Sequence, residues 1–184
     1  MKELSEHVLD IAKNSVEAGA KRVDITLTEG ADGWLTIVIS DNGRGMSQEL
    51  LRQVSDPFTT TRTTRKVGMG IPLYRQTAEQ TGGTLDIQSA LGVGTVVTAT
   101  VNTRHLDCPP AGDLAGTVAL LIQGSPEADF TYRHTTPRGE AALDTRELRR
   151  ELGDEVSLAE PAVFQWIRAY LTEQEAQLEG AEAI

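Results

Sequence analysis

Apolar and polar positions follow two different periods in the first part of the chain. Residues 4–18 carry apolar side chains every three or four positions, which predicts an amphipathic helix that ends at Gly19. Residues 23–28 alternate apolar and polar side chains, and residues 34–39 form a second short run rich in apolar residues. Because a glycine-containing polar segment separates these runs, the pattern predicts two strands joined by a turn.

The next segment repeats this order of elements. Ser47 is placed to cap a short helix, and residues 56–70, which have no clean period and are rich in Thr, Arg and Gly, predict a long loop. Residues 71–81 predict a helix, and residues 84–89 and 95–101 predict a hairpin of two strands. The sequence therefore favours an α+β fold with helices on one face of a mostly antiparallel sheet.

The composition changes around residues 109–112, which contain two prolines and a glycine, and this indicates a linker. The elements predicted beyond it are strands over 117–123 and 130–135, a short helix over 145–152 and a last helix that Pro161 opens. Residues 173–184 are acidic and rich in Ala, Gly and Gln, so we expect this end of the chain to fray.

The overall composition is that of a folded protein with an acidic surface. The 184 residues carry a net charge of −10 and include one cysteine, Cys108, which has no internal disulfide partner. The acidic balance argues against nucleic acid and anionic membranes as partners. No apolar run approaches membrane-spanning length, and the amino terminus lacks the order of a signal peptide. These features lead us to expect a cytoplasmic protein.

Two polar residues lie one turn apart on the first predicted helix. Asp10 and Asn14 are four positions apart, so they share a helix face that flanks the apolar stripe. The Asn14 oxygen is a neutral hard ligand suited to Mg²⁺ that phosphates and water also hold. The Asp10 carboxylate can orient or deprotonate an attacking group. Taken alone, the pair is also explained by a solvated helix face.

A second candidate segment, residues 41–46, directly follows an apolar strand. A carboxylate at the strand end, here Asp41, can accept a hydrogen bond from an exocyclic amine such as N6 of adenine. Gly43 and Gly45 allow the backbone to approach the base beside Met46. Asp-Asn-Gly is also a common turn sequence, and that alternative stays open when the segment is taken alone.

The predicted loop of residues 56–70 ends in glycines ahead of a helix, which expose backbone N–H groups to a phosphate. A last glycine pair precedes Thr95, whose hydroxyl can reach a base or a water beside it. The candidate nucleotide-binding residues of the two segments are Phe58, Thr59, Thr60, Thr61, Arg62, Arg65, Lys66, Gly68, Met69, Gly70, Ile71 and Thr95. Each segment alone is also compatible with an ordinary loop or hairpin turn.

In this order and at these spacings, the segments resemble the motifs of the GHKL superfamily of histidine kinases, DNA gyrase, Hsp90 and mismatch-repair ATPases. The matching motifs are the N box at Asp10–Asn14, the glycine boxes at Asp41–Met46, Gly68–Ile71 and Gly92–Thr95, and the lid entry at Asp56–Arg62. The resemblance implies a Bergerat-type two-layer α/β sandwich that holds ATP and Mg²⁺ between its helical layer and a lid. It also implies a catalytic role for Asp10 and magnesium coordination by Asn14.

The resemblance divides the chain into four parts. We expect an ATP-binding domain over 1–102, a linker over 103–116, a β/α extension over 117–178 and a disordered tail over 179–184. The extension either continues the sheet or forms a docking surface for a partner. We further expect no phosphoacceptor hairpin before the domain and no transducer domain after it.

Different motifs resemble different branches of the superfamily. Residues 13–25 resemble mismatch-repair ATPases, whereas residues 56–61 and 68–71 resemble histidine kinases. Asp10 stands where the hydrolytic branch has a glutamate, and its side chain is about 1 Å shorter, a difference that can cost about 10²-fold in rate. Glu17 stands where many histidine kinases have a basic residue.

Three functions follow from this comparison. The first is a stand-alone ATP- and Mg²⁺-binding module that acts on a protein partner as a kinase, by analogy with anti-sigma-factor or histidine kinases. The second is an ATP-dependent switch with little catalysis. The third is a weak ATPase of the mismatch-repair type that forms a homodimer. Whether the chain is an enzyme stays open at this point.

Overall fold

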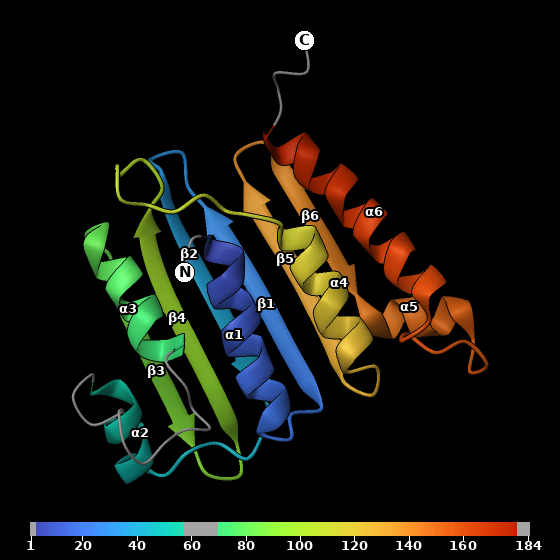
Figure 1. Cartoon of the computed structure of the whole chain (residues 1–184), viewed down its shortest axis with the longest axis horizontal. Coiled ribbons are helices and arrows are strands. Elements are labelled where there is room, and N and C mark those ends of the chain that lie inside the picture. The colour runs from blue at the N-terminus through green and yellow to red at the C-terminus, as the bar shows by residue number, and fades with distance from the viewer. Residues whose placement is uncertain (1–2, 57–69, 180–184) are drawn as a thin grey trace.

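The computed structural model describes residues 3–56 and 70–179 (Figure 1). Its helices are α1 (Leu4–Glu17), α2 (Gln48–Ser55), α3 (Gly70–Gln80), α4 (Leu114–Gly124), α5 (Thr145–Leu152) and α6 (Pro161–Glu179). Its strands are β1 (Arg22–Glu29), β2 (Trp34–Asp41), β3 (Leu85–Ala90), β4 (Gly94–Asn102), β5 (Asp129–Thr136) and β6 (Gly139–Asp144). None of the helices within these ranges is long and apolar enough to cross a membrane.

The strands form one six-stranded sheet in the order β3-β4-β2-β1-β5-β6. All neighbours are antiparallel except β1 and β5, which are parallel. Figure 1 shows α3, α1, α4 and α6 side by side over one face of the sheet, with α2 and α5 near two of its corners. The predicted α+β sandwich with a mixed, mostly antiparallel sheet is therefore confirmed.

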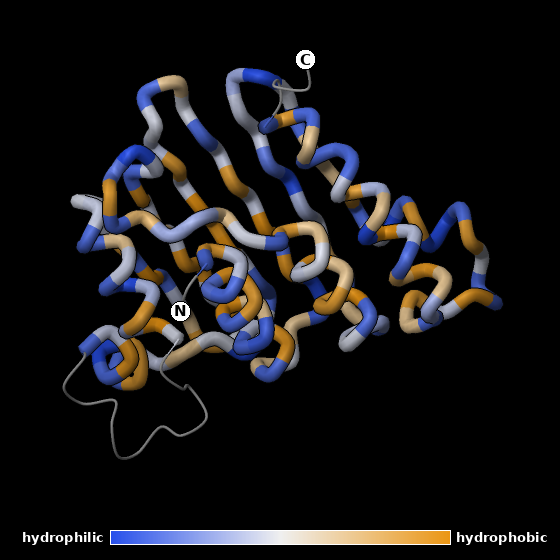
Figure 2. The backbone as a smooth tube through the Cα atoms, turned by 45° about the horizontal axis from the view of Figure 1, so that its top comes forward, coloured by the Kyte–Doolittle hydropathy of each residue, from blue (hydrophilic) through white to orange (hydrophobic). Residues whose placement is uncertain are grey.

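Alternation along the strands builds the core between the two layers. Val23, Ile25 and Leu27 of β1 are buried beneath the helices, and the residues between them face the other side of the sheet. Figure 2 shows the same alternation of apolar and polar positions along the neighbouring strands. The helices add Val8 of α1 and Tyr74 of α3, both fully buried, so one apolar layer fixes the helices on the sheet.

The strand register aligns polar side chains across one end of the sheet. Asp41, the last residue of β2, lies opposite Thr95 of β4, and Thr95 lies opposite Ser89 of β3. Asp41 has the same parity along β2 as the buried Ile37 and Ile39, so the row lies on the helix-covered face. A row of polar side chains at the end of an otherwise apolar face indicates a candidate ligand-binding site.

The extension after residue 113 continues the same sheet. Strand β5 pairs with β1 from Asp129 to Thr135, and α4 packs beside α1. The carbonyl groups of Pro110 and Ala111 accept hydrogen bonds from the N–H groups of Leu4 and Ser5 at 2.9 Å each. These two bonds satisfy donors that the first turn of α1 leaves free, so the segment before α4 also completes the amino-terminal helix.

The strand expected over 117–123 is wrong, because these residues belong to helix α4. Nearly every side chain of α4 is buried, and Leu120 is the only large apolar residue of the helix that is exposed. A helix that is apolar around almost its whole circumference has no clear 3.6-residue period, so a short apolar run reads as a strand. The Asp113 side chain caps this helix by accepting a hydrogen bond from the N–H of Gly116 at 2.8 Å.

The predicted fraying of the last segment is also wrong as far as Glu179, because α6 continues to that residue. Glu175 accepts a hydrogen bond from the Tyr132 hydroxyl and lies 2.8 Å from Nδ1 of His134, both on β5. Leu178 is buried one turn further along. These contacts attach the end of α6 to the sheet. Strand β6, which the sequence pattern does not predict, pairs with β5 next to them.

A buried histidine lies between α1 and α3. His7 is 1% exposed, its Nε2 lies 2.9 Å from Oγ1 of Thr77, and its ring stacks on Tyr74 with 4.6 Å between centroids. Burial lowers the pKa of His7 from 6.5 to about 4. The neutral imidazole is therefore the form that packs between these helices.

This burial predicts a pH-dependent loss of stability. Between pH 6.5 and 4 the unfolded chain binds a proton at His7 that the folded chain does not, so lowering the pH favours unfolding. A pKa that falls from 6.5 to about 4 on folding corresponds to about 3 kcal/mol lost by pH 4. Urea unfolding of His7→Gln is expected to lack this part of the pH dependence.

His105→Gln provides the matched control, because His105 is exposed. The unfolding free energy of His105→Gln should decrease as the pH is lowered from 6.5 to 4, as that of the wild type does. The same slope in His7→Gln and in the wild type between pH 6.5 and 4 would show that His7 is not the group responsible.

Candidate functional site

A cavity of about 730 Å³ opens at the end of the sheet where Asp41 lies. Helix α1, the first turn of α3, helix α2 and the ends of β2, β3 and β4 surround it. Its lining residues are Ile11, Asn14, Ser15, Glu17, Ala18, Asp41, Arg44, Gly45, Met46, Leu50, Val54, Ile71, Ile87, Thr95 and Val97. The volume and the mixture of apolar walls with few polar groups are typical of a small-molecule site.

Asp41 occupies one end of this cavity and is held by two donors. Its Oδ1 accepts the backbone N–H of Gly43 at 2.8 Å, and its Oδ2 accepts the Ser15 hydroxyl at 2.6 Å. Ser15 lies on α1 one residue after Asn14 and is 4% exposed. Since each carboxylate oxygen has two lone pairs, both can still accept a hydrogen bond from a ligand.

The backbone after Asp41 is fixed by close contacts that only glycine permits. Gly45 has φ +70°, and a side chain on it would run into the carbonyl group of Ala90 at the end of β3. The N–H of Gly92 donates to the carbonyl of Arg44 at 2.8 Å, and the N–H of Arg44 donates to that of Ala18 at 2.9 Å. The first glycine box is thereby attached both to α1 and to the β3–β4 turn.

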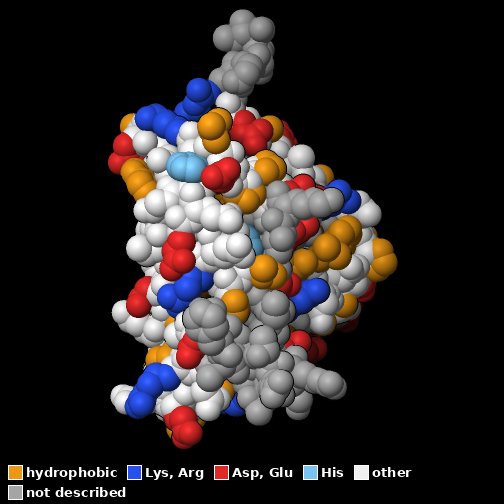
Figure 3. Space-filling view, turned by 60° about the vertical axis from the view of Figure 1, so that its left-hand side comes forward, with side chains coloured by type: hydrophobic (Ala, Val, Ile, Leu, Met, Phe, Trp, Pro, Cys, Tyr) orange, Lys and Arg blue, Asp and Glu red, His pale blue; other side chains and the backbone are white. Residues whose placement is uncertain are grey.

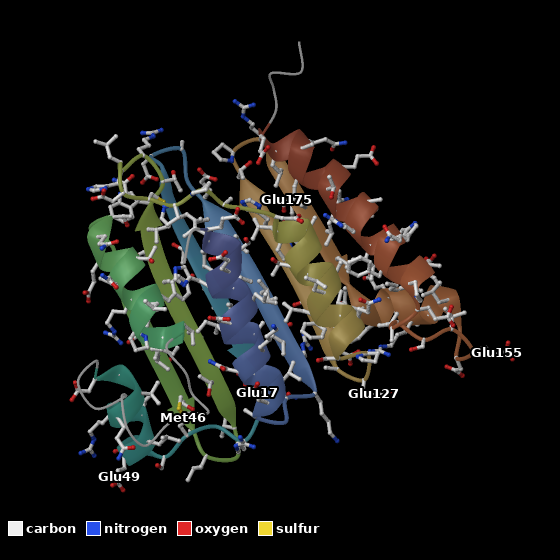
Figure 4. The ribbon with its side chains drawn as sticks, in the orientation of Figure 1. Glu17, Met46, Glu49, Glu127, Glu155 and Glu175 are labelled. Carbon is white, nitrogen blue, oxygen red and sulfur yellow. The ribbon has the colours of Figure 1, made fainter. Side chains whose placement is uncertain are left out.

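Thr95 and Ser89 continue the polar row beside Asp41. Their hydroxyl oxygens are 2.8 Å apart, and Oγ of Ser89 also accepts the backbone N–H of Met46 at 2.8 Å. Figure 4 shows Met46 between α2 and the ends of β3 and β4. The row thus connects both strands to the segment that forms the cavity wall.

Asn14 and Glu17 line the cavity from α1, and Figure 4 shows Glu17 near the end of that helix. Asp10, one turn before Asn14, lies beside the start of α3: a Cβ atom on Gly70 would be 3.4 Å from the Cβ atom of Asp10. Burial raises the pKa of Asp10, which makes its carboxylate a stronger base. The structure therefore brings the N box next to Gly70 of the second glycine box, where α3 starts.

The sequence-predicted residues fall into three groups. Those that line the cavity are Asn14, Asp41, Gly45, Met46, Ile71 and Thr95. Those directly beside it are Asp10 and Gly70, which face each other, and Gly43, which bonds to Asp41. Those that lie outside the described residues are Phe58, Thr59, Thr60, Thr61, Arg62, Arg65, Lys66, Gly68 and Met69.

Sequence reasoning missed three polar residues at this site. Ser15 falls at the spacing of the apolar positions of α1, and a hydroxyl at such a core position is itself a signal of a buried polar partner. Arg44 lines the cavity between the two glycines. Ser89 carries no local signal, because its contacts arise only from the pairing of β3 with β4.

Comparison with known proteins decides the family. The sequence profile described as "Histidine kinase-, DNA gyrase B-, and HSP90-like ATPase" matches residues 2–105, more than half of the chain. The chain belongs to this ATPase family. Its matched region is therefore an ATP-binding module, and the predicted GHKL resemblance is confirmed.

Several histidine kinases are similar to this module of the ATPase family. The chain is 32% identical over 99 residues to sporulation kinase D of Bacillus subtilis, covering 53% of this chain and 19% of that protein. It is 34% identical over 99 residues to histidine protein kinase DivJ of Caulobacter vibrioides, covering 51% of this chain and 17% of that protein. The chain thus spans about a fifth of the length of these relatives.

A longer match reaches beyond the module. An uncharacterized sensor-like histidine kinase of Rhizobium meliloti is 26% identical over 163 residues, covering 84% of this chain and 31% of that protein. Among solved structures, the MutL ATPase domain of Aquifex aeolicus complexed with ADP has a TM-score of 0.51 at 14% identity. That match covers 78% of this chain and 63% of that one, and it supports the fold.

The close packing of the first glycine box makes a testable prediction about stability. Gly45 and Gly92 have φ +70° and φ +75°, so alanine at either position has the same backbone strain of about 1–2 kcal/mol. An added Cβ meets the Ala90 carbonyl at position 45 and nothing within 4 Å at position 92. Urea unfolding should therefore show a larger loss of stability for Gly45→Ala than for Gly92→Ala. Equal losses would contradict the close approach of Gly45 to the Ala90 carbonyl.

Proposed function

We propose that the cavity binds ATP with its adenine at Asp41 and its phosphates toward the start of α3. The observation that carries this proposal is the Asp41 carboxylate, positioned by Ser15 and Gly43 and facing a cavity of about 730 Å³. A carboxylate held by two donors keeps lone pairs for the exocyclic amine of adenine. Apolar side chains such as Ile87 and Val97 line the same cavity and offer contact surface to a base.

Magnesium is part of this proposal through Asn14. No group of three or more His, Cys, Asp or Glu residues within 3–56 and 70–179 could hold a metal ion by itself. Asn14, however, lines the cavity one turn from Asp10. A single amide oxygen together with phosphate oxygens and water fits the coordination that Mg²⁺ prefers in nucleotide sites. Bound Mg²⁺ would neutralise phosphate charge there.

The proposed activity is transfer of a phosphoryl group to a protein partner. Asp10 would accept the proton of the acceptor group, because burial raises its pKa and it faces the helix start at Gly70. The similarity to histidine kinases supports a kinase-type role. On the face drawn in Figure 3, the described acidic and basic side chains are interspersed. The net charge of −10 favours a protein over a nucleic acid as partner.

A second candidate is an ATP-dependent switch with little catalysis. The short side chain of Asp10 supports it, because a carboxylate about 1 Å from its best position can lose about 10²-fold in rate. In that case ATP binding itself would change the surface that a partner recognises. The two candidates share the nucleotide site and differ only in what Asp10 does.

Nucleotide binding is tested at Asp41. Asp41→Asn replaces a carboxylate oxygen with an amide N–H₂, which cannot accept from the adenine amine, so ATP affinity is expected to fall about 10- to 100-fold. Isothermal titration calorimetry with Mg²⁺ measures this change. Asp86→Asn is the matched control, since Asp86 is exposed on β3 and points away from the helix-covered face. Unchanged ATP affinity in Asp41→Asn would refute the proposed position of adenine.

Catalysis is tested at Asp10. If the chain transfers phosphate, radiolabel from ATP should reach a co-purifying protein, and Asp10→Ala should slow the labelling at least about 10²-fold without abolishing ATP binding. If the chain is a switch, the wild type and Asp10→Ala both bind ATP, and neither of them transfers its phosphate or hydrolyses it at a measurable rate. Rapid labelling by Asp10→Ala at the wild-type rate would exclude Asp10 as the base.

A further inference from the structure

The sheet has an open face, opposite to the helices, whose centre carries no charge. Helices α1, α3, α4 and α6 lie over the other face (Figure 1), so the even-numbered residues of β2 and β4 belong to the open face. These residues lie between Trp34 and Ser40 and between Val96 and Asn102, and none of them is charged, although 24% of the chain is. Because charged residues are depleted at the centre of protein interfaces, this area is a candidate contact surface.

Threonine side chains make the open face flat and partly apolar. Thr26 of β1 and Thr98 of β4 lie on either side of Val38, and each is only partly exposed. Each threonine presents a methyl group beside its hydroxyl, as β-branched residues on a pleated sheet do. Nearer the rim, the hydroxyls of Thr84 and Thr100 are 3.2 Å apart, so they can bond to each other. Covering such a face costs less than covering charged groups.

One row across the open face carries opposite charges at equal distances from β2. Beyond Val38, the row continues through Thr98 to Asp86 on β3. In the other direction it continues through Thr26 to Arg133 on β5. Since neighbouring strands are about 4.8 Å apart, Asp86 and Arg133 each lie about 10 Å from Val38. Both charged residues are exposed, so the row is neutral at its centre and has one charge of each sign at its two ends.

We propose that two copies of this chain pack their open faces together about a two-fold axis parallel to β2. This axis places Val38 against Val38 of the second copy, and Asp86 of each chain against Arg133 of the other. A two-fold axis across the strands would instead place Asp86 against Asp86, which like-charge repulsion disfavours. Arg133 also pairs with Glu140 at 3.0 Å, and its guanidinium keeps N–H donors for a second carboxylate.

The size of this contact predicts a weak dimer. Five strands, from β3 to β5 in the sheet order, overlap in this arrangement, and they span about 24 Å across and about 20 Å along the strands. The contact area is thus about 500 Å² per chain, or about 1,000 Å² in total, at the lower end of specific interfaces. We therefore expect a Kd of about 10–100 µM, which is typical of a transient contact. This association does not depend on nucleotide binding.

Sedimentation velocity from about 1 to 300 µM protein in about 0.15 M salt measures this association. The wild type is expected to shift from one chain to two. Asp86→Arg and Arg133→Asp each place like charges together twice in a dimer, so each should raise the Kd about tenfold or more. A 1:1 mixture of these two variants restores both opposite-charge pairs, and its Kd should return to within about threefold of the wild-type value.

Glu79→Arg is the matched control for net charge. Glu79 is exposed on α3, over the other face of the sheet, and its replacement changes the net charge as much as Asp86→Arg does. Glu79→Arg alone should dimerise as the wild type does. Its mixture with Arg133→Asp keeps one like-charge contact in each mixed dimer, because Asp86 is unchanged. That mixture should therefore associate more weakly than the mixture of Asp86→Arg with Arg133→Asp.

A cysteine at position 38 tests the axis in a second way. In a Cys108→Ser background, Val38→Cys should form a disulfide between copies when diamide is added, because the two positions face each other. Gln88→Cys in the same background is the control, since Gln88 is exposed on β3 and lies about 20 Å from its own copy across the axis.

Three results would overturn the inference. The first is a wild type that stays monomeric up to about 300 µM. The second is a dimer whose Kd neither Asp86→Arg nor Arg133→Asp changes, which would assign the contact to another surface, such as the outer edge of β3. The third is cross-linking of Gln88→Cys in preference to Val38→Cys.

Discussion

The carboxyl group of Asp41 is the point at which the parts of the site are joined. It closes strand β2, accepts the Ser15 hydroxyl from α1 and accepts the Gly43 N–H from the glycine box. The backbone of Asp41 also requires glycine at the start of β4, because a side chain on Gly94 would collide with the Asp41 carbonyl. A helix, two strands and a loop therefore have one relative position in which all of these contacts are satisfied, and the cavity is the space that this position leaves.

Sequence reasoning found the parts of the site whose signal is local. Asp10 and Asn14 share a helix face because of their spacing alone, and Asp41 follows an apolar run that ends where the glycines begin. Ser89 has no such signal, since its three partners come from β4 and from the segment around Met46. Contacts of this kind depend on strand register, which a pattern along one chain does not contain.

The extension shows the same limit at the level of whole elements. Helix α4 was expected to be a strand because its apolar residues surround the helix axis, and only its packing beside α1 and α6 explains that pattern. Strand β6 contains two alanines and a glycine, which favour strands poorly, so its pairing with β5 determines its conformation. Helix α6 extends past residue 173, where fraying was expected to begin, because Glu175 pairs with His134 of β5 and Leu178 is buried.

The parallel pairing of β1 with β5 leaves one edge of β1 unpaired while the chain is being synthesised. The hydroxyl of Thr131 bonds to Asp24, and these residues are 107 positions apart. During synthesis, β1 therefore emerges long before its partner and has one side of unpaired backbone groups in the meantime. An unprotected edge of this kind can pair with another nascent chain. Strand β5 of the extension covers this edge of the ATPase sheet. Pairing with another chain is therefore most favoured before residue 136, the last residue of β5, has been synthesised.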